Sequence, residues 1–271
     1  MRLTKLLALS SLLTFGATFT ACDDIAADDR YKELDTIDAK RTVLLEEYTG
    51  QLCVKCPTAH GVIEQLQEQY GDRFIAVSFH CGGEAFSIQQ NDPAWEGITG
   101  LATPVSEQYG KAAGVSALPK GRVDREGGLT NPPQWSDGVR QQIAIDSDVE
   151  LTLEGGLDAD KKNISVSARI ISPDNVSGAK LQLWVVENGI TALQLMPDGD
   201  VNMDYVHNNV FRADVNGFGG ESVSIQAGVY TDKSYTVAVQ DEWVADNLDI
   251  VALVYTDGGV VQAAKLKMTN N

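Results

Sequence analysis

The stretch EEYTGQLCVKCPTAHG, residues 46–61, contains two of the four cysteines of the chain, Cys53 and Cys56, spaced as C-x-x-C. A short apolar run at 43–45 precedes it and is typical of a buried strand. After it, apolar residues recur at helical spacing until Gly71: Val62, Ile63, Leu66 and Tyr70. The pair is therefore predicted where a strand leads into a helix that begins at Cys53.

A C-x-x-C pair has three chemical interpretations: half of a zinc site, a structural disulfide or a redox-active dithiol. Zinc normally needs four ligands, and the other candidates are scattered along the chain: His60, His80, Cys81 and His207. A disulfide between Cys53 and Cys56 would close a very small loop, so loop-closure entropy would stabilise the fold little. The redox interpretation requires a strand, the C-x-x-C and then a helix, and this chain has that order.

The position of the pair also suits thiol chemistry. Backbone N–H groups and the dipole at a helix N-terminus stabilise a thiolate over a thiol. We therefore expect Cys53 to be an exposed nucleophile with a lowered pKa, and Cys56, one turn further on, to resolve a mixed disulfide. Lys55 lies between them and adds a positive charge that favours the thiolate.

The surrounding residues, 42–146, alternate between strand and helix patterns. A second buried strand lies at 73–83, and the irregular segment that follows, 84–104, is interpreted as an insertion. A short helix at 105–114 and a turn leading into a third strand at 115–127 complete the series. This order is typical of a three-layer α/β unit.

The pattern changes after Asp146. Residues 147–271 contain alternating strands separated by Gly, Asn, Asp and Pro turns, with no cysteine and one histidine, His207. Strands at this spacing with polar turns predict an antiparallel β-sandwich of the Ig-like or jelly-roll type. The expected fold is therefore an α/β domain followed by an all-β domain.

Residues 1–21 have the pattern of an export signal. Arg2 and Lys5 form a short basic region, and an apolar run then leads to small residues before Cys22. The run is too short for a membrane span. Cys22 resembles the lipidated cysteine of a bacterial lipobox, which predicts a mature N-terminus anchored by lipid. The alternative is an ordinary secretory signal followed by an incidental cysteine.

Acidic residues dominate the segment after the signal and the chain as a whole. Residues 22–41 form an acidic tether with too few bulky apolar side chains to fold, and they resemble the surface-export signal of Bacteroidetes lipoproteins. The chain has 38 acidic and 21 basic residues, a net charge of −17 that becomes −19 without Arg2 and Lys5. Such a charge is repelled by phosphate backbones, so nucleic acid is excluded as a partner. The predicted location is the outer membrane, and the tether also suggests its outer face.

A proline far along the chain bears on the C-x-x-C. Pro119, in ALPKGRVDR at 117–125, follows a turn and directly precedes a strand pattern. Together with EEYTGQLCVKCPTAHG, it makes residues 42–125 resemble a thioredoxin-like domain, in which a cis-proline loop lies opposite the C-x-x-C. With the later stretch YVHNNVFRADVNGFGG at 205–220, the chain resembles the 28-kDa outer-membrane lipoprotein family of Bacteroidetes. That family joins a lipidated N-terminus, a thioredoxin-like domain and a C-terminal β-sandwich, and it is better known for surface lipoproteins than for enzymes.

The resemblance implies that the C-x-x-C pair is the dithiol and that Pro119 is the cis-proline. Two residues depart from the thioredoxin pattern. Leu52 stands where a tryptophan often precedes the first cysteine, and Leu118 replaces the threonine before the proline. The thioredoxin proton acceptor has no clear counterpart, although Glu46 and Glu47 lie on the preceding strand and could serve. These departures leave the expected fold unchanged, but they argue against reductase-like catalysis.

The end of the second strand supplies two further candidates, His80 and Cys81. Strand C-terminal ends gather at one edge of an α/β sheet, so both would lie near the C-x-x-C. There, His80 could tune the pKa of Cys53, and Cys81 could exchange with it. The alternative is that Cys81 packs as a small apolar side chain. His60, on the predicted helix, is interpreted as an exposed helix residue.

One acidic stretch in the C-terminal part resembles a calcium loop. Oxygen-bearing side chains alternate there: Asp198, Asp200, Asn202 and Asp204. Met203 takes the position of the loop glycine and Asn209 that of the bidentate glutamate, so an acidic turn is the better interpretation. No metal and no cofactor is predicted.

Two functions are compatible with these patterns. The first is a lipid-anchored thiol–disulfide oxidoreductase for protein or peptide substrates, with attack by Cys53 and resolution by Cys56. The second is a non-catalytic, surface-exposed binding or adhesion lipoprotein in which the thioredoxin-like domain is a scaffold. The expected partners are protein or peptide thiols and disulfides, a surface or envelope protein, and the outer membrane through the N-terminal lipid.

Overall fold

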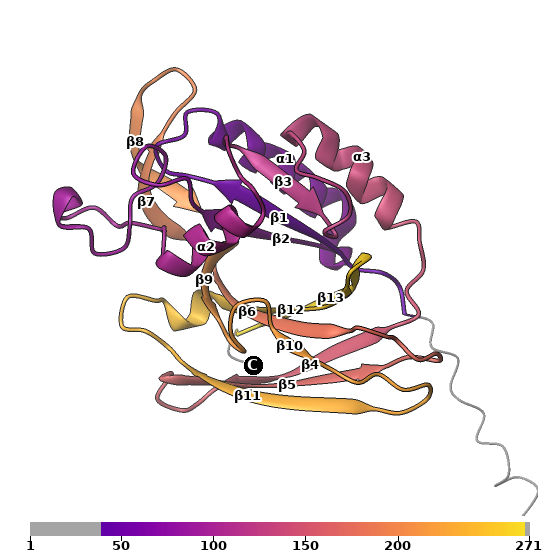
Figure 1. The fold of residues 1–271 in the computed structure, drawn as a ribbon. Helices are drawn as coiled ribbons and strands as arrows, with labels where there is room; N and C mark the ends of the chain where they lie inside the picture. Colours follow the sequence, from indigo (N-terminus) through magenta and orange to yellow (C-terminus); the bar gives the residue numbers. More distant parts are fainter. Residues whose placement is uncertain (1–38, 269–271) are drawn as a thin grey trace, which may run out of the picture. The chain divides into compact units, whose positions relative to one another are not determined.

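The computed structural model describes residues 39–268 (Figure 1). The predicted signal at 1–21, the lipidated Cys22 and the tether up to residue 38 lie outside the described residues. The α-helices are α1 Cys56–Tyr70, α2 Pro104–Ala112 and α3 Pro132–Gln142. The strands are β1 Val43–Thr49, β2 Phe74–His80, β3 Lys120–Val123, β4 Glu150–Leu157, β5 Asn163–Ile171, β6 Lys180–Glu187, β7 Ile190–Leu195, β8 Val201–His207, β9 Val210–Asp214, β10 Glu221–Ser222, β11 Thr231–Ala238, β12 Leu248–Thr256 and β13 Gly259–Lys267.

Strands β1, β2 and β3 and the three helices form an N-terminal α/β layer. β1 pairs with β2 in parallel, from Val43 opposite Phe74 to Thr49 opposite His80, and with β3 in antiparallel orientation. β1 and β2 are buried along their whole length. The reason is that both faces of the layer are covered, one by α1 and α3 and the other by α2 and C-terminal strands.

Two hydrophobic clusters fill the two faces of this layer. The cluster under α1 and α3 contains Val43, Leu45, Ala59, Ile63, Leu66, Trp135 and Val139. The cluster on the α2 face contains Leu44, Tyr48, Phe79, Tyr109, Trp184 and Phe211. Trp184 and Phe211 come from β6 and β9, so the C-terminal strands complete the core of the N-terminal layer.

The sheet of the N-terminal layer continues beyond β2 into the C-terminal part. β9 pairs in parallel with β2, with Ser78 opposite Val210, and Ser78 N donates to Asn209 O at 2.7 Å. The resulting eight-stranded sheet has the order β13-β12-β6-β9-β2-β1-β3, with β10 paired to β6. The described residues after α3 contain no α-helix, which agrees with the change of pattern near Asp146. One sheet nevertheless runs through both parts.

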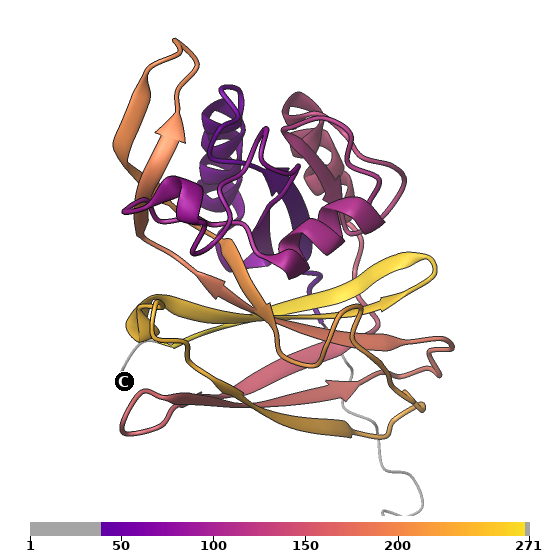
Figure 2. The same cartoon turned by 60° about the vertical axis from the view of Figure 1, so that its left-hand side comes forward.

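A second sheet, β11-β5-β4, packs against the C-terminal half of the first (Figure 2). Along β5, buried apolar side chains alternate with exposed ones: Ile164, Val166, Ala168 and Ile170 are buried. They share one core with Leu183, Val185, Ile250 and Ala252 of β6 and β12. The fold is therefore β-rich, with one mixed sheet, a three-stranded antiparallel sheet and a two-stranded antiparallel hairpin among the described residues, and the expectation that strands form the C-terminal part is confirmed.

The hairpin β7–β8 stands apart from both sheets as a two-stranded unit. Figures 1 and 2 show it projecting beside the α/β layer, whereas the sequence placed these residues in the sandwich. It leaves the main sheet between β6 and β9, and Tyr205 on β8 contacts His60 on α1, so packing against α1 decides its place. Its exposed side chains include Val201, Met203 and Val206.

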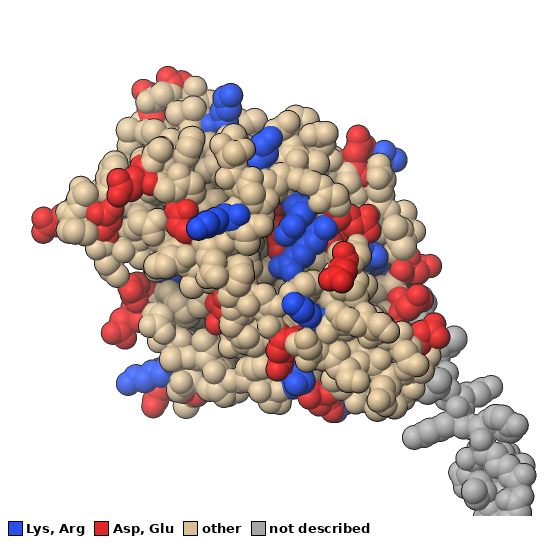
Figure 3. Space-filling view, in the orientation of Figure 1, with Lys and Arg blue, Asp and Glu red and all other residues tan. Residues whose placement is uncertain are grey.

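Charged side chains are spread over the surface. Figure 3 shows Asp and Glu side chains scattered over one face, mainly toward its edges, with several Lys and Arg side chains near its middle. This distribution is that of a solvated acidic surface. None of the helices within residues 39–268 is both long and apolar enough to cross a membrane.

Candidate functional site

The dithiol loop, residues 50–56, joins β1 to α1 and contains a disulfide between Cys53 and Cys56, whose Cα atoms are 5.5 Å apart. The helix begins at Cys56 with Lys55 as its N-cap, so the prediction that it begins at Cys53 is wrong. Cys53 N donates to Gly50 O, and Cys56 N donates to Cys53 O, both at 3.1 Å, which closes separate turns ahead of the helix. Pro57, which has no N–H to lose, occupies the first helical turn.

Cys53 is buried, and the prediction of an exposed nucleophile is wrong. Only 5% of its surface is exposed and Cys56 is fully buried, whereas Val54 between them is 40% exposed. Lys55 is also exposed and makes no side-chain cap on the helix. The segment after β2 and the hairpin β7–β8 both hydrogen-bond to the dithiol loop, and together they cover it.

The proline loop lies at the same edge of the sheet as the dithiol loop. The Leu118–Pro119 peptide bond is cis, as the resemblance implied. Lys120 pairs with Tyr48, so the buried Pro119 reaches the level of Thr49, just before the dithiol loop begins. The register of β3 on β1 therefore brings together two motifs that are far apart in the sequence.

Glu46 and Glu47 of β1 point to opposite faces of the sheet. Glu46 lies on the α2 face, where guanidinium nitrogens of Arg122 and Arg125 each approach its oxygens to 2.7 Å. Burial by itself raises the pKa of Glu46, but the two guanidinium groups outweigh this and hold its pKa below the ordinary value. Glu46 is therefore an ionised partner of two arginines that faces away from α1, which argues against the predicted role beside the dithiol.

Glu47 faces α1 and is the carboxyl group on the dithiol side. It accepts a hydrogen bond from Ser78 Oγ at 2.6 Å, and its Oε1 lies 3.5 Å from Nε2 of His60, one helical turn after Cys56. Burial is the largest influence and raises the pKa of Glu47, while His60 and Ser78 offset only part of that effect. A buried carboxyl group whose proton is retained more strongly than usual thus lies under the first turns of α1.

The three histidines of the chain gather beside α1. His60 Nδ1 is 2.7 Å from Tyr205 Oη, and its Nε2 is 3.1 Å from Thr49 Oγ1. The ring of His207 lies 5.4 Å from that of His80 and 6.3 Å from that of His60, measured between centroids. Burial lowers the pKa of His207 to about 3 and that of His80 well below its ordinary value, so both are neutral at physiological pH.

Sequence reasoning missed this histidine cluster. It treated His60 as an exposed helix residue, but β8 lies against that helix and leaves His60 half-buried. No local pattern joins His207 to the other two rings, because the hairpin that carries it is placed by tertiary packing. His80 lies near the dithiol side as expected, but as a neutral ring it carries no charge with which to tune Cys53.

Cys81 is a buried thiol on the opposite face from α1. It belongs to the cluster on the α2 face, and a Cβ added to Gly110 of α2 would lie 2.7 Å from its Sγ. Burial raises the pKa of Cys81 to about 12, with further contributions from Glu107 and Glu47. A buried thiol that stays protonated is a poor nucleophile, which favours the interpretation of Cys81 as a small apolar side chain.

The acidic stretch that resembles a calcium loop forms the turn and one strand of the hairpin. Asp200 N donates to Asp198 Oδ1 at 3.1 Å, and Asp204 N donates to Asn202 Oδ1 at 2.9 Å. A strand rises about 3.3 Å per residue, so Asp204 lies about 13 Å beyond Asp200, too far to share one calcium ion. Within residues 39–268, no group of three or more His, Cys, Asp or Glu is arranged to hold a metal ion.

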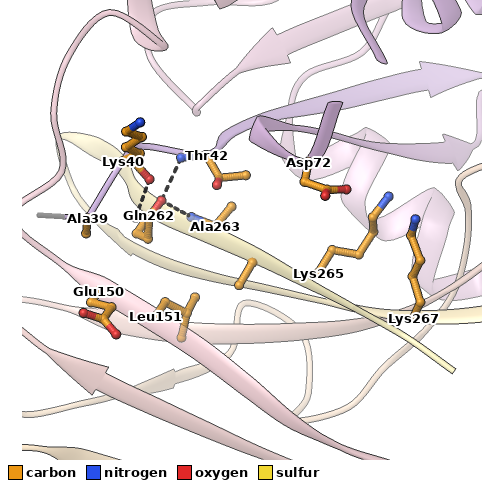
Figure 4. Close-up of a pocket in the computed structure, with 11 residues that line it drawn as sticks. Ala39, Lys40, Thr42, Asp72, Glu150, Leu151, Gln262, Ala263, Lys265 and Lys267 are labelled. Carbon is orange, nitrogen blue, oxygen red and sulfur yellow. Dashed lines mark hydrogen bonds between the residues drawn. The ribbon is translucent and has the colours of Figure 1, made fainter. Parts of the chain in front are cut away.

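A cleft of about 580 Å³ lies beside β13, away from the dithiol loop (Figure 4). Its lining residues come mainly from the segment before β1 and from β13: Ala39, Lys40, Thr42, Gln262, Lys265 and Lys267. None of the candidate site residues lines this cleft. Beside α1, a cavity of only about 30 Å³ is lined in part by His60, Ser78 and Tyr205. The side chains of the candidate site therefore pack against one another and leave little open space.

Comparison with known proteins defines the class of this chain as an outer membrane protein. The family described as outer membrane protein Omp28 matches residues 106–271, more than half of the chain. The chain therefore belongs to the Omp28 family. The match begins within α2, so it includes Pro119 but not the C-x-x-C. The predicted location at the outer membrane is confirmed by this membership.

Two solved structures have a similar fold. HBP35 of Porphyromonas gingivalis has a TM-score of 0.66 and 16% identity, over 85% of this chain and 76% of that chain. A crystal structure of a protein from Agrobacterium tumefaciens has a TM-score of 0.53 and 13% identity, over 85% of this chain and 96% of that chain. A domain of the outer membrane lipoprotein Omp28 from P. gingivalis has 21% identity and a TM-score of 0.33, over 45% of this chain and 89% of that chain. No curated protein matches the sequence.

Proposed function

We propose that this protein is a lipid-anchored thiol–disulfide exchange protein of the outer membrane, with residues 42–146 as a thioredoxin-like domain. The observation that carries the proposal is that the Cys53–Cys56 pair and the loop of Pro119 lie at one edge of the sheet. The strand order β2-β1-β3, with β3 antiparallel and a helix directly after β1, supports it. The lipid anchor rests on the lipobox-like pattern before Cys22.

The exchange reaction transfers two electrons. A thiolate of a dithiol substrate attacks Sγ of Cys53, the Cys53–Cys56 bond breaks, and Cys56 leaves as a thiolate that takes up a proton. The second thiolate of the substrate then attacks the mixed disulfide, forms the substrate disulfide and releases Cys53, which also becomes protonated. Two electrons and two protons pass from the substrate to the protein, and the reverse reaction reduces a substrate disulfide.

Glu47 is the group that we assign to proton transfer. It is the buried carboxyl group on the face covered by α1, the helix that begins at Cys56. Burial raises its pKa, which brings proton gain and loss closer to neutral pH than for an exposed glutamate. The start of α1 stabilises the thiolate forms of the cysteines, and the exposed Lys55 adds positive charge.

The burial of Cys53 favours a second candidate function, a surface-exposed binding or adhesion lipoprotein. A disulfide that serves only as a scaffold needs no access to substrate, and only 5% of Cys53 is exposed. The exposed apolar side chains on β8, Val201, Met203 and Val206, offer contact area to a protein partner.

The reduction potential separates the two candidates. The full-length protein, with Cys22→Ser and Cys81→Ser so that only the dithiol titrates, is equilibrated in glutathione or dithiothreitol buffers. Free thiols are then alkylated and counted by mass spectrometry. A potential between about −120 and −270 mV supports thiol–disulfide exchange. A potential below about −300 mV, typical of structural disulfides, would contradict the exchange proposal and support the scaffold.

A further inference from the structure

Two buried glutamines tie the dithiol loop to the hairpin β7–β8. Gln194, on β7, places Nε2 3.2 Å from the carbonyl oxygen of Cys53. Gln51, in the loop itself, donates from Nε2 to Leu193 O at 3.1 Å, and its own carbonyl oxygen accepts from Leu195 N at 2.8 Å. Both glutamine side chains are fully buried. The main chain of β7 therefore lies along the dithiol loop as an extended segment.

The other side of the dithiol loop is held by the segment after β2. Leu52 N donates to Phe86 O at 2.8 Å, and Leu101 N donates to Gln51 Oε1 at 2.9 Å. A Cβ added to Gly50 would lie 2.2 Å from Phe86 O, so the two backbones approach as closely as only glycine permits. This contact fixes the loop on one side and leaves the hairpin as the separable cover.

The hairpin has the features of a hinged element. Two-residue connections join it to β6 and β9, at 188–189 and 208–209, and it forms a two-stranded sheet of its own. Each connection contains a residue in the left-handed region, Gly189 with a φ of 68° and Asn209 with a φ of 58°. Rotation at these two connections would move the hairpin as one body and leave both large sheets paired.

We propose that the hairpin β7–β8 is a gate, a segment that covers the dithiol and moves away to admit a substrate. The side chain of Gln194 is its latch, the group that holds the hairpin closed. This proposal rests on the proposed function. In the closed form, Sγ of Cys53 is too buried for a protein thiolate to approach it in line with the disulfide bond. Opening exposes this sulfur and frees the carbonyl oxygens of Gln51 and Cys53. The two carbonyl oxygens then accept hydrogen bonds from the main chain of an extended peptide that carries the substrate cysteines. This peptide takes the position that β7 occupies in the closed form.

The latch is incompletely paired, which suits a gate that opens. Oε1 of Gln194 is buried and has no hydrogen-bond partner among residues 39–268. A buried acceptor without a partner destabilises the closed form relative to a fully paired one. The substrate peptide therefore competes with a hairpin that is held by fewer hydrogen bonds than its buried amide groups could make.

The variant Gln194→Ala tests the latch through a rate that requires no physiological substrate. The oxidised full-length protein is mixed with dithiothreitol, and loss of the Cys53–Cys56 disulfide is followed by acid quenching and alkylation. We expect the variant to be reduced about tenfold faster than the wild type, which corresponds to about 1.4 kcal/mol in the opening equilibrium. An unchanged rate of reduction would overturn the gate.

Gln182→Ala is the matched control. Gln182 is equally buried, and its Nε2 lies 3.0 Å from Gly217 O, within the C-terminal part and away from the dithiol loop. If the gate is correct, this variant is reduced at the wild-type rate. Equal acceleration in both variants would show that general loosening of the fold controls access, and the gate would be wrong.

Amide hydrogen exchange of the wild type provides a measurement that depends on no variant. We expect peptides from β7–β8 to exchange through local opening, faster than peptides from β12 in the middle of the sheet. A hairpin that exchanges only together with β12 would overturn the gate. None of these measurements uses the reduction potential. A potential typical of a structural disulfide would therefore contradict the proposed function. The rates of disulfide reduction and of hydrogen exchange would still show whether the hairpin opens.

Discussion

His60 Nδ1 lies 2.7 Å from the phenol oxygen of Tyr205, which joins helix α1 to strand β8 across 145 positions of the sequence. The two rings are 5.7 Å apart between centroids. The same helix begins at Cys56, and the same hairpin carries Gln194. This contact is therefore a second attachment of the hairpin to the dithiol region, in addition to the glutamine hydrogen bonds.

The variant Tyr205→Phe should weaken this attachment without changing the ring. We expect a loss of about 1 kcal/mol in the free energy of unfolding, because His60 Nδ1 loses a hydrogen-bond partner in a half-buried place. Urea unfolding at pH 7 measures it. Tyr230→Phe, at an exposed tyrosine, is the control and should change the stability little. Equal stability of Tyr205→Phe and the wild type would contradict the assigned role.

The variant Glu46→Gln should be most destabilising at neutral pH. Burial opposes ionisation of Glu46, but Arg125 and Arg122 hold its folded pKa below 4.5. Its stabilising contribution is therefore present above the unfolded pKa and is lost as the pH falls through the folded pKa. We expect a loss of roughly 3 kcal/mol at pH 7, because two guanidinium groups lose their carboxylate. Urea unfolding between pH 3 and pH 8 should show this loss shrinking toward low pH; a pH-independent loss would argue against the pair.

The variant Glu47→Gln should show the opposite dependence on pH. Burial raises the folded pKa of Glu47 above 4.5, so its favourable contribution is present below the unfolded pKa and is lost as the pH rises through the folded pKa. An amide stays uncharged and keeps an oxygen that can accept from Ser78 Oγ. Relative to the wild type, the variant should therefore gain stability from pH 4 to pH 8 in the same urea series. A relative loss that grows over this range would show that the neighbours of Glu47 outweigh its burial.

The variant Gly110→Ala should destabilise the protein through Cys81. The added Cβ would lie 2.7 Å from Sγ of Cys81, and overpacking of this kind costs about 1–3 kcal/mol. In a Cys81→Ala background the contact with Sγ is absent and only the 2.9 Å contact with Cβ remains, so the same substitution should destabilise the protein less. Thermal unfolding of the four proteins in this cycle measures the coupling. Additive effects of the two substitutions would mean that α2 does not pack on this sulfur.

Several elements could be predicted because local chemistry decides them. The helix after the C-x-x-C ends at Tyr70, as its apolar spacing predicted, and Gly71 follows with a φ of 55° that favours glycine. The buried strand at β2 and the short helix at α2 are also confirmed. The start of α1 was predicted wrongly, because the turns that involve Gly50 and Cys53 precede the helix and the sequence pattern does not distinguish them from it.

The alternation along β1 is a local property, and it places Glu46 and Glu47 on opposite faces whatever the rest of the fold does. Likewise, the C-x-x-C lies at the start of a helix because a strand, two cysteines and a helix follow one another along the chain. Which carboxyl group faces the dithiol depends on the face that α1 covers, and that is decided by packing against the sheet. Gln194, 141 positions away, hydrogen-bonds to the carbonyl oxygen of Cys53, and no periodic pattern links residues at that separation. Only tertiary structure, in which β9 pairs with β2 and carries the hairpin to the dithiol loop, decides those contacts.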